Sequence, residues 1–150
     1  MEPRVSLITL GVADVARSKQ FYEALGWSGQ EVEGTVFVQA GPLAIVLWGR
    51  DLLAADAGLP DAPPPIEGSA PTFGGIALAQ NVRTRDEVDA VLAAAAAAGA
   101  TITSPAAETF YGGYAGYFTD PDGHAWEIAH NPGFTLADDG ALVLPDLGTT

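Results

Sequence analysis

Residues 10–27 read LGVADVARSKQFYEALGW, and this stretch decides the fold class. It begins inside the apolar, β-branched run Val5–Val12, which is typical of a strand. Asp14 then stands where a helix N-cap is expected, and apolar residues recur near helical spacing as far as Leu25, before Gly26. The stretch therefore predicts a strand that runs directly into a capped helix of residues 15–25.

Short strands and a proline-rich segment follow this unit. Thr35–Ala40 and Leu43–Trp48 are both apolar, and the Gly41-Pro42 turn separates them, so a pair of strands is predicted. Residues 59–71 read LPDAPPPIEGSAP, in which three consecutive prolines exclude a helix or a central strand. We interpret this segment as a linker and as the clearest internal boundary.

The same order of elements then returns. Gly75–Val82 predicts a strand, and Thr84 or Asp86 can start a helix that ends at Gly99. Three further strands are predicted at residues 101–104, 114–119 and 125–129, the last two joined by the turn Asp120-Pro121-Asp122-Gly123. Strand, helix and three strands thus occur twice, which is an internal repeat of about half the chain. Residues 134–145 predict a small extra hairpin that covers an edge or a site mouth.

Composition limits the function classes. The chain has 150 residues, 48% hydrophobic, no cysteine and a formal net charge of -13. The acidity argues against a nucleic-acid partner. It could attract a cationic ligand, but its ordinary role is to keep an Ala- and Gly-rich protein soluble. No apolar run approaches the roughly 20 residues of a membrane span. The N-terminal residues Met1-Glu2-Pro3-Arg4 lack the layout of a secretory signal, so we expect a cytoplasmic protein with no membrane partner.

The order and the residues of these motifs resemble those of the vicinal oxygen chelate superfamily, which includes glyoxalases, bleomycin-resistance proteins and dioxygenases. Residues 10–27 are similar to its first strand and helix, and DPDGH (120–124) followed by Trp126-Glu127-Ile128 is similar to its closing hairpin. The resemblance implies an α+β fold of paired βαβββ modules. We expect one domain over residues 1–150, with modules at about 5–58 and 72–132, the linker 59–71 between them and the hairpin in 133–150.

In the enzymes of that superfamily the two modules enclose a divalent metal. The resemblance implies His, Glu or Gln ligands on the first and the last strand of each module. The last-strand positions fall on Glu127 and Ile45, and Ile45 is flanked by Ala44 and Val46. The first-strand positions fall near Leu7 and Gly75, with in-phase neighbours Thr9 and Ala77. Only Glu127 is a plausible ligand, whereas a catalytic metal normally has about three protein ligands, so a divalent metal cofactor is not expected.

Aromatic residues complete the candidate site, because small-molecule pockets are mostly apolar with few polar groups. The predicted ligand-binding residues are Glu127, Trp48, Phe110, Tyr111, Tyr114 and Tyr117. Trp126 and Ile128 are expected on the other face of the strand from Glu127, as core. His130 is also expected on that other face, and His124 is expected to hydrogen-bond across the turn.

Three functions are compatible with these residues. The first is a metal-free protein that binds a small aromatic or cationic compound, as bleomycin-resistance members do. The second is a lyase, an isomerase or a dioxygenase, either with a divergent metal site or with Glu127 as a general base. The third is a dimer scaffold whose site has closed. The resemblance also implies a homodimer.

Overall fold

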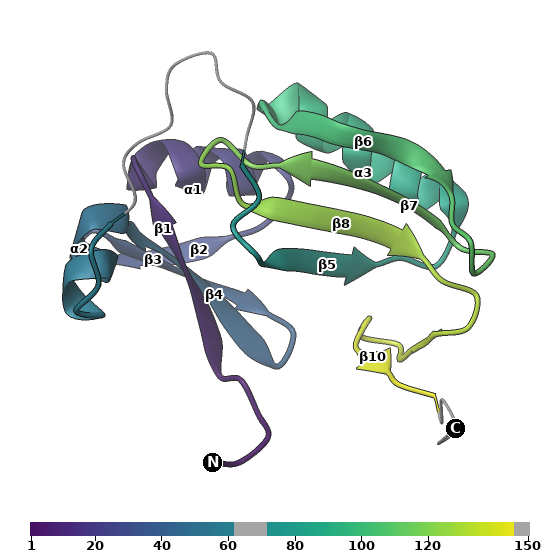
Figure 1. Ribbon diagram of the computed structural model, residues 1–150, viewed down its shortest axis with the longest axis horizontal. Coiled ribbons are helices and arrows are strands. Elements are labelled where there is room, and N and C mark those ends of the chain that lie inside the picture. The colour runs from purple at the N-terminus through teal and green to yellow at the C-terminus, as the bar shows by residue number, and fades with distance from the viewer. Residues whose placement is uncertain (62–71, 146–150) are drawn as a thin grey trace. The chain divides into compact units, whose positions relative to one another are not determined.

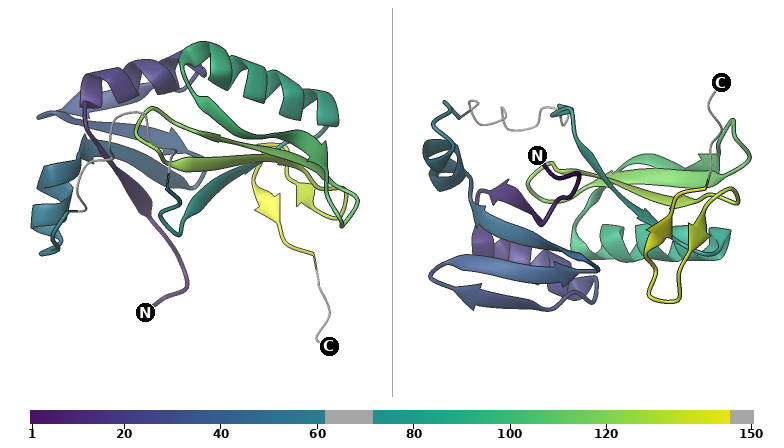
Figure 2. Two further views of the ribbon diagram at one scale, coloured as in Figure 1. Left: turned by 45° about the horizontal axis from the view of Figure 1, so that its top comes forward. Right: turned by 90° about the horizontal axis from the view of Figure 1, so that it is seen from below.

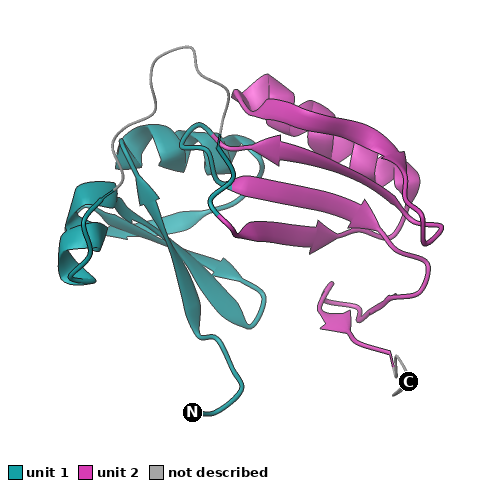
Figure 3. Ribbon diagram, in the orientation of Figure 1, with its two compact units in different colours: residues 1–74, 121–124 teal, residues 75–120, 125–150 magenta. Residues whose placement is uncertain are grey.

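The computed structural model describes residues 1–61 and 72–145, which form two compact units. Unit 1 comprises Met1–Gly74 together with Pro121–His124, and unit 2 comprises Gly75–Asp120 and Ala125–Thr150 (Figure 3). Each unit contains a four-stranded sheet, and the β-α-β-β-β order occurs in both (Figure 1). The predicted α+β fold of paired βαβββ modules is therefore confirmed. Ten residues of the predicted linker, 62–71, lie outside the described residues.

Unit 1 follows the predicted order with two additions. Its elements are β1 (Leu7–Val12), α1 (Val15–Ala24), β2 (Gly29–Val32), β3 (Thr35–Ala40), β4 (Leu43–Gly49) and α2 (Arg50–Asp56). The sheet order is β1-β4-β3-β2, in which β1 runs parallel to β4 and the other pairs are antiparallel. The two additions are β2, the third strand of the predicted order, to which the sequence assigned no residues, and α2, which was not predicted.

Local chemistry explains where α1 begins and what it covers. The Asp14 carboxylate accepts a hydrogen bond from the Arg17 backbone N–H at 3.0 Å, as an N-cap should. Phe21 and Tyr22 of α1 are 3% exposed, and they belong to the same core as the buried Leu10 and Leu47 of the sheet. Alternation along the strands thus gives the sheet one apolar face for the helix.

Unit 2 repeats this plan with a longer helix. Its elements are β5 (Ala77–Asn81), α3 (Arg85–Ala98), β6 (Thr101–Glu108), β7 (Tyr114–Thr119), β8 (Ala125–His130), β9 (Thr135–Leu136) and β10 (Leu142–Val143). The sheet order is β5-β8-β7-β6, and β9 pairs with β10 in the predicted small hairpin (Figure 2). Thr84 caps α3 through a full capping box with Glu87, and Gly99 ends it at φ 107°. Both predicted helix boundaries are confirmed.

The turn between β7 and β8 belongs to unit 1, although the strands on either side belong to unit 2. The Asp122 side chain is 4% exposed. Its carboxylate accepts hydrogen bonds from the Ala13 backbone N–H at 2.8 Å, the Arg17 guanidinium at 2.7 Å and the Ser18 hydroxyl at 2.5 Å. These bonds fix the turn to the first turn of α1. Within residues 1–61 and 72–145, no helix is long and apolar enough to cross a membrane.

Candidate functional site

Glu127 lies in the middle of β8, in the interior of the unit 2 sheet. Its register partners are Tyr117 on β7 and Ala79 on β5. The neighbours Trp126 and Ile128 are 6% and 1% exposed and face the opposite side, where they pack in the core with Phe118. The predicted alternation is confirmed, and Glu127 lies on the sheet face opposite Trp126 and Ile128.

Small side chains surround this carboxylate. Register partners share a face, so the strand pairings assign the other residues of this face on β5, β7 and β8. Apart from Glu127 and Tyr117, they are Ala77, Ala79, Asn81, Ala115, Thr119, Ala125 and Ala129. None of them is charged, so Glu127 is the charged side chain of this face on these three strands.

Tyr117 is the polar partner of Glu127. The two side chains are hydrogen-bonded, and burial, followed by this hydrogen bond, raises the pKa of Tyr117 to about 12. The phenol is therefore neutral near pH 7, and its O–H donates while the Glu127 carboxylate accepts. The carboxylate keeps further acceptor positions, because an ionised carboxylate offers about four lone pairs. The pair can accept a hydrogen bond or a cation from a bound molecule.

Tyr111 approaches this pair from the loop between β6 and β7. Its phenol is near enough to contribute to the raised pKa of Tyr117. The ring is seated over Gly113, where an added Cβ would lie 2.5 Å from the Tyr111 Cε2 atom. Phe110 packs edge-on against Tyr111 with ring centroids 5.2 Å apart and is fully exposed. The loop thus brings Tyr111, one of its two predicted aromatic residues, near Tyr117.

The other predicted residues lie elsewhere. Tyr114 pairs with His130 on the face opposite Glu127, and its hydroxyl donates to Asp89 of α3 at 3.0 Å. This hydrogen bond is the main cause of the raised pKa of Tyr114. Trp48 lies on β4 of unit 1, where Gly11 is its register partner. The expected face of His130 is confirmed.

The strand register gives the residues that lie level with Glu127 on the first strand of its module. Its register partner on β5 is Ala79. Ala77, the predicted in-phase neighbour of Gly75, lies on the same face of β5, and Gly75 itself precedes that strand. In unit 1 the predicted neighbour Thr9 pairs with Val46, whereas Ile45 lies on the other face of β4, with Leu47.

The residues at these positions do not fit a divalent metal. Ala79 and Val46 carry no donor atom, and Thr9 offers a neutral hydroxyl, a poor ligand for the metals that imidazole and carboxylate groups bind. Across the described part of the chain, no group of three or more His, Cys, Asp or Glu side chains is placed to hold a metal ion. Glu127 is thus a lone carboxylate with a phenol beside it.

Two features were not found from the sequence. The first is the pairing of Tyr117 with Glu127. Counting outward from the DPDG turn would have given it, because Thr119 pairs with Ala125 and each step along the hairpin preserves the register. The buried role of Asp122 was hidden because its motif is also ordinary turn chemistry.

Comparison with known proteins identifies the family of this chain. The sequence model of the Glyoxalase/Bleomycin resistance protein/Dioxygenase superfamily matches residues 4–128. A glyoxalase-related enzyme from Fulvimarina pelagi is 34% identical with a TM-score of 0.82, over 95% of this chain and 98% of that one.

More distant structures share the fold. The hypothetical protein SA1046 from S. aureus is 23% identical, with a TM-score of 0.72 over 87% of this chain and 95% of that one. Lactoylglutathione lyase from Agrobacterium tumefaciens is 20% identical, with a TM-score of 0.61 over 86% and 94%. No protein with a curated description matches the chain. The family match covers most of the sequence, and the chain belongs to the glyoxalase/bleomycin resistance protein/dioxygenase superfamily.

Proposed function

We propose that this protein binds a small, flat, cationic organic molecule at Glu127, without a metal. The observation that carries the proposal is the hydrogen-bonded pair of Glu127 and Tyr117 on a sheet face of small, uncharged residues. A carboxylate in such surroundings has no cationic side chain of β5, β7 or β8 to neutralise it. A cationic ligand supplies that charge, and the net charge of -13 favours its approach.

The shape of the face supports a flat ligand. Ala77 and Ala79 are exposed, Ala125 is half-buried, and each carries only a methyl group, so the sheet surface around Glu127 is low and apolar. Tyr111 and Tyr117 add phenol rings, which stack on aromatic ligands and attract cations through their faces. An aromatic ring lying on the alanines therefore places its cationic group at the carboxylate.

The proposal is tested by titrating ethidium, a flat permanent cation, into the protein after dialysis against EDTA. We expect saturable fluorescence enhancement in the metal-free protein. Glu127→Gln removes the charge but keeps an oxygen that can accept from Tyr117, so binding should weaken about five- to hundredfold with little change in melting temperature. Glu23→Gln is the matched control, because Glu23 is an exposed carboxylate on α1 and its loss changes the net charge equally.

The two variants distinguish a contact between ethidium and Glu127 from attraction by the overall negative charge. Equal weakening in both variants would show that only the overall charge attracts ethidium, which contradicts the proposal. Phenanthridine, the neutral ring system, should bind more weakly than ethidium and should not respond to Glu127→Gln. Absence of ethidium binding by the native protein also contradicts the proposal.

An enzymatic function is the second candidate, and one observation favours it. The relative from Fulvimarina pelagi, 34% identical over almost the whole chain, is described as a glyoxalase-related enzyme. The class of such an activity would be a lyase, an isomerase or a dioxygenase of the superfamily. Metal analysis of the purified protein tests it: stoichiometric Zn, Ni, Mn or Fe, lost together with ethidium binding on EDTA dialysis, would favour the enzyme.

A further inference from the structure

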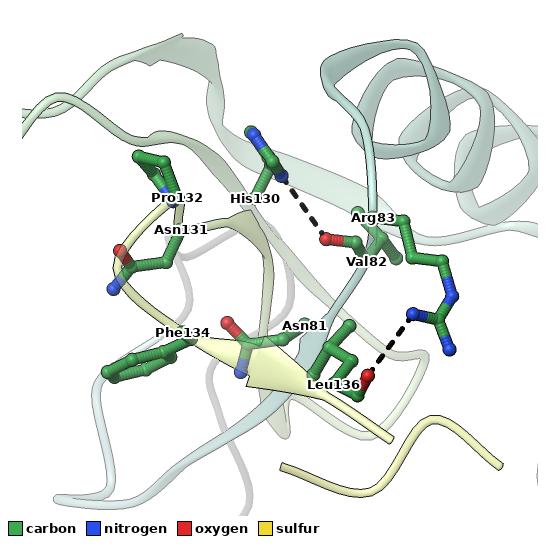
Figure 4. A pocket seen from close by; sticks show the side chains of 8 residues that line it. All are labelled: Asn81, Val82, Arg83, His130, Asn131, Pro132, Phe134 and Leu136. Carbon is green, nitrogen blue, oxygen red and sulfur yellow. Dashed lines mark hydrogen bonds between the residues drawn. The ribbon is translucent and has the colours of Figure 1, made fainter. Parts of the chain in front are cut away.

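A pocket lies within unit 2, and its lining does not include the Glu127 pair. It has a volume of about 210 Å³ and is lined by residues at the ends of β5 and β8 and by the segment that enters β9. Figure 4 shows Asn81 and Leu136 facing Asn131 and Phe134 across it, with His130 and Val82 at one end. Glu127, Tyr117 and Tyr111 do not line this pocket, so it is independent of the proposed function.

Arg83 builds one wall of the pocket. Its guanidinium donates to the backbone carbonyls of Leu136 at 3.3 Å and Ala137 at 2.6 Å, which ties the β9–β10 hairpin to the end of β5. The hairpin in turn supplies the apolar wall of Leu136, beside the Phe134 ring that precedes β9. The predicted role of this hairpin as the cover of a site mouth fits this arrangement. Because Arg83 donates to these carbonyls, its guanidinium is held at the hairpin and part of its hydrogen-bonding capacity is already used there.

The polar groups of the pocket differ in what they already bind. The Asn131 side-chain oxygen accepts from the Gly133 N–H at 2.9 Å, and His130 Nδ1 lies 3.4 Å from the Val82 carbonyl oxygen. The Asn81 carboxamide makes no hydrogen bond to any residue of 1–61 or 72–145. It therefore presents one acceptor and two donors to the pocket, side by side in one plane.

We propose that this pocket binds a small planar molecule through a carboxamide or lactam edge that pairs with Asn81. Such an edge places a donor beside an acceptor, which is the complement of the Asn81 side chain. The volume of 210 Å³ lies below the roughly 300–1,000 Å³ of sites for drug-sized ligands, so the pocket suits a single ring. Phe134 and Leu136 provide the apolar contact for that ring.

The proposal excludes charged ligands of the same shape. A carboxylate would place two acceptors against Asn81 and would meet a protein of net charge -13. An amidinium would place donors against the Asn81 NH₂ group and leave one of them unpaired. Benzamide, benzoate and benzamidine are therefore three probes of nearly equal shape that differ only in this hydrogen-bonding edge.

The experiment is an NMR titration of the ¹⁵N-labelled full chain with each probe. We expect benzamide to shift the side-chain NH₂ signals of Asn81 and the backbone signals of Phe134 and Leu136, with benzoate and benzamidine at least about fivefold weaker. Asn81→Asp keeps the shape but offers only acceptors, so the preference should switch to benzamidine. Asn81→Leu should lose the preference among the three probes.

Gln80→Glu is the matched control, because Gln80 is an exposed amide on the opposite face of β5. It adds the same charge as Asn81→Asp and should leave the order of the three probes unchanged. The proposal is overturned if benzamide shifts none of these signals, or if Asn81→Asp and Gln80→Glu change the preference alike. Glu127→Gln should not affect benzamide, so failure here and failure of the ethidium experiment are distinguishable.

Discussion

Replacing Asp122 with alanine should cost a large part of the stability of the protein. Three donors converge on its carboxylate at 2.5–2.8 Å, and the side chain is 4% exposed. Removing one partner of a buried charged pair costs about 3–5 kcal/mol. The Arg17 side chain is 49% exposed and regains water, and Ser18 can still donate to the Asp14 carbonyl oxygen at 3.0 Å. We therefore expect a loss of about 2–4 kcal/mol in the free energy of unfolding.

The assay is urea unfolding followed by tryptophan fluorescence and by circular dichroism, with thermal melts alongside. A loss of this size should lower the melting temperature by about 4–16 °C, from about 2–4 °C per kcal/mol for a chain of this length. Asp122→Asn keeps an acceptor for Ala13 and should cost less. Asp138→Ala, at an exposed position of the hairpin, is the control and should stay within about 0.5 kcal/mol. A loss below about 1 kcal/mol for Asp122→Ala would refute the reasoning.

Three further predictions concern Tyr117, Gly116 and the oligomeric state. The pKa of Tyr117 is raised to about 12 in the folded protein, against about 10 in the unfolded chain. The stabilisation that the neutral phenol gives the folded state is therefore complete below about pH 10 and is lost as the pH rises towards 12. Urea unfolding at about pH 9 and about pH 11.5 should show a smaller change in the free energy of unfolding between the two pH values in Tyr117→Phe than in the native protein. Gly116→Ala would place a Cβ 2.9 Å from the Ala106 backbone nitrogen and 2.6 Å from Leu92 Cδ1, so the melt should show a loss of about 1–3 kcal/mol, and an unchanged melt would contradict the close approach. The homodimer implied by the family predicts a mass near twice 15.4 kDa in light scattering, and a monomer at high concentration would count against it.

The elements predicted correctly are those in which local signals agree. Asp14 and Thr84 cap helices whose apolar spacing is also helical, and β3 and β7 match their predicted residues throughout. The strand β2 reads GQEV, which is too polar and short to show the apolar alternation of a strand, and it forms because it pairs with β3 at the sheet edge. The helix α2 follows β4 without a side-chain cap, so no start signal marks it.

The site was only partly predictable for a related reason. The face of β8 on which Glu127 lies follows from alternation with Trp126 and Ile128, which is local information. That Tyr117 faces Glu127 while Tyr114 faces α3 depends on strand register, which a list of aromatic residues does not contain. The pocket at Asn81 depends on a hairpin that Arg83 holds more than fifty residues away in the chain, and no motif in the sequence signals that contact.

The assignment of residues 121–124 to unit 1 also limits how such a protein can be recombined. A gene fragment that ends at Gly74 encodes all the strands of unit 1 but omits Asp122, the acceptor for the first turn of α1. Chimeras that join the first half of this chain to the second half of a relative would inherit α1 and its acceptor from different parents. The two halves are therefore expected to exchange freely only between relatives that keep an aspartate at this turn and a serine at position 18.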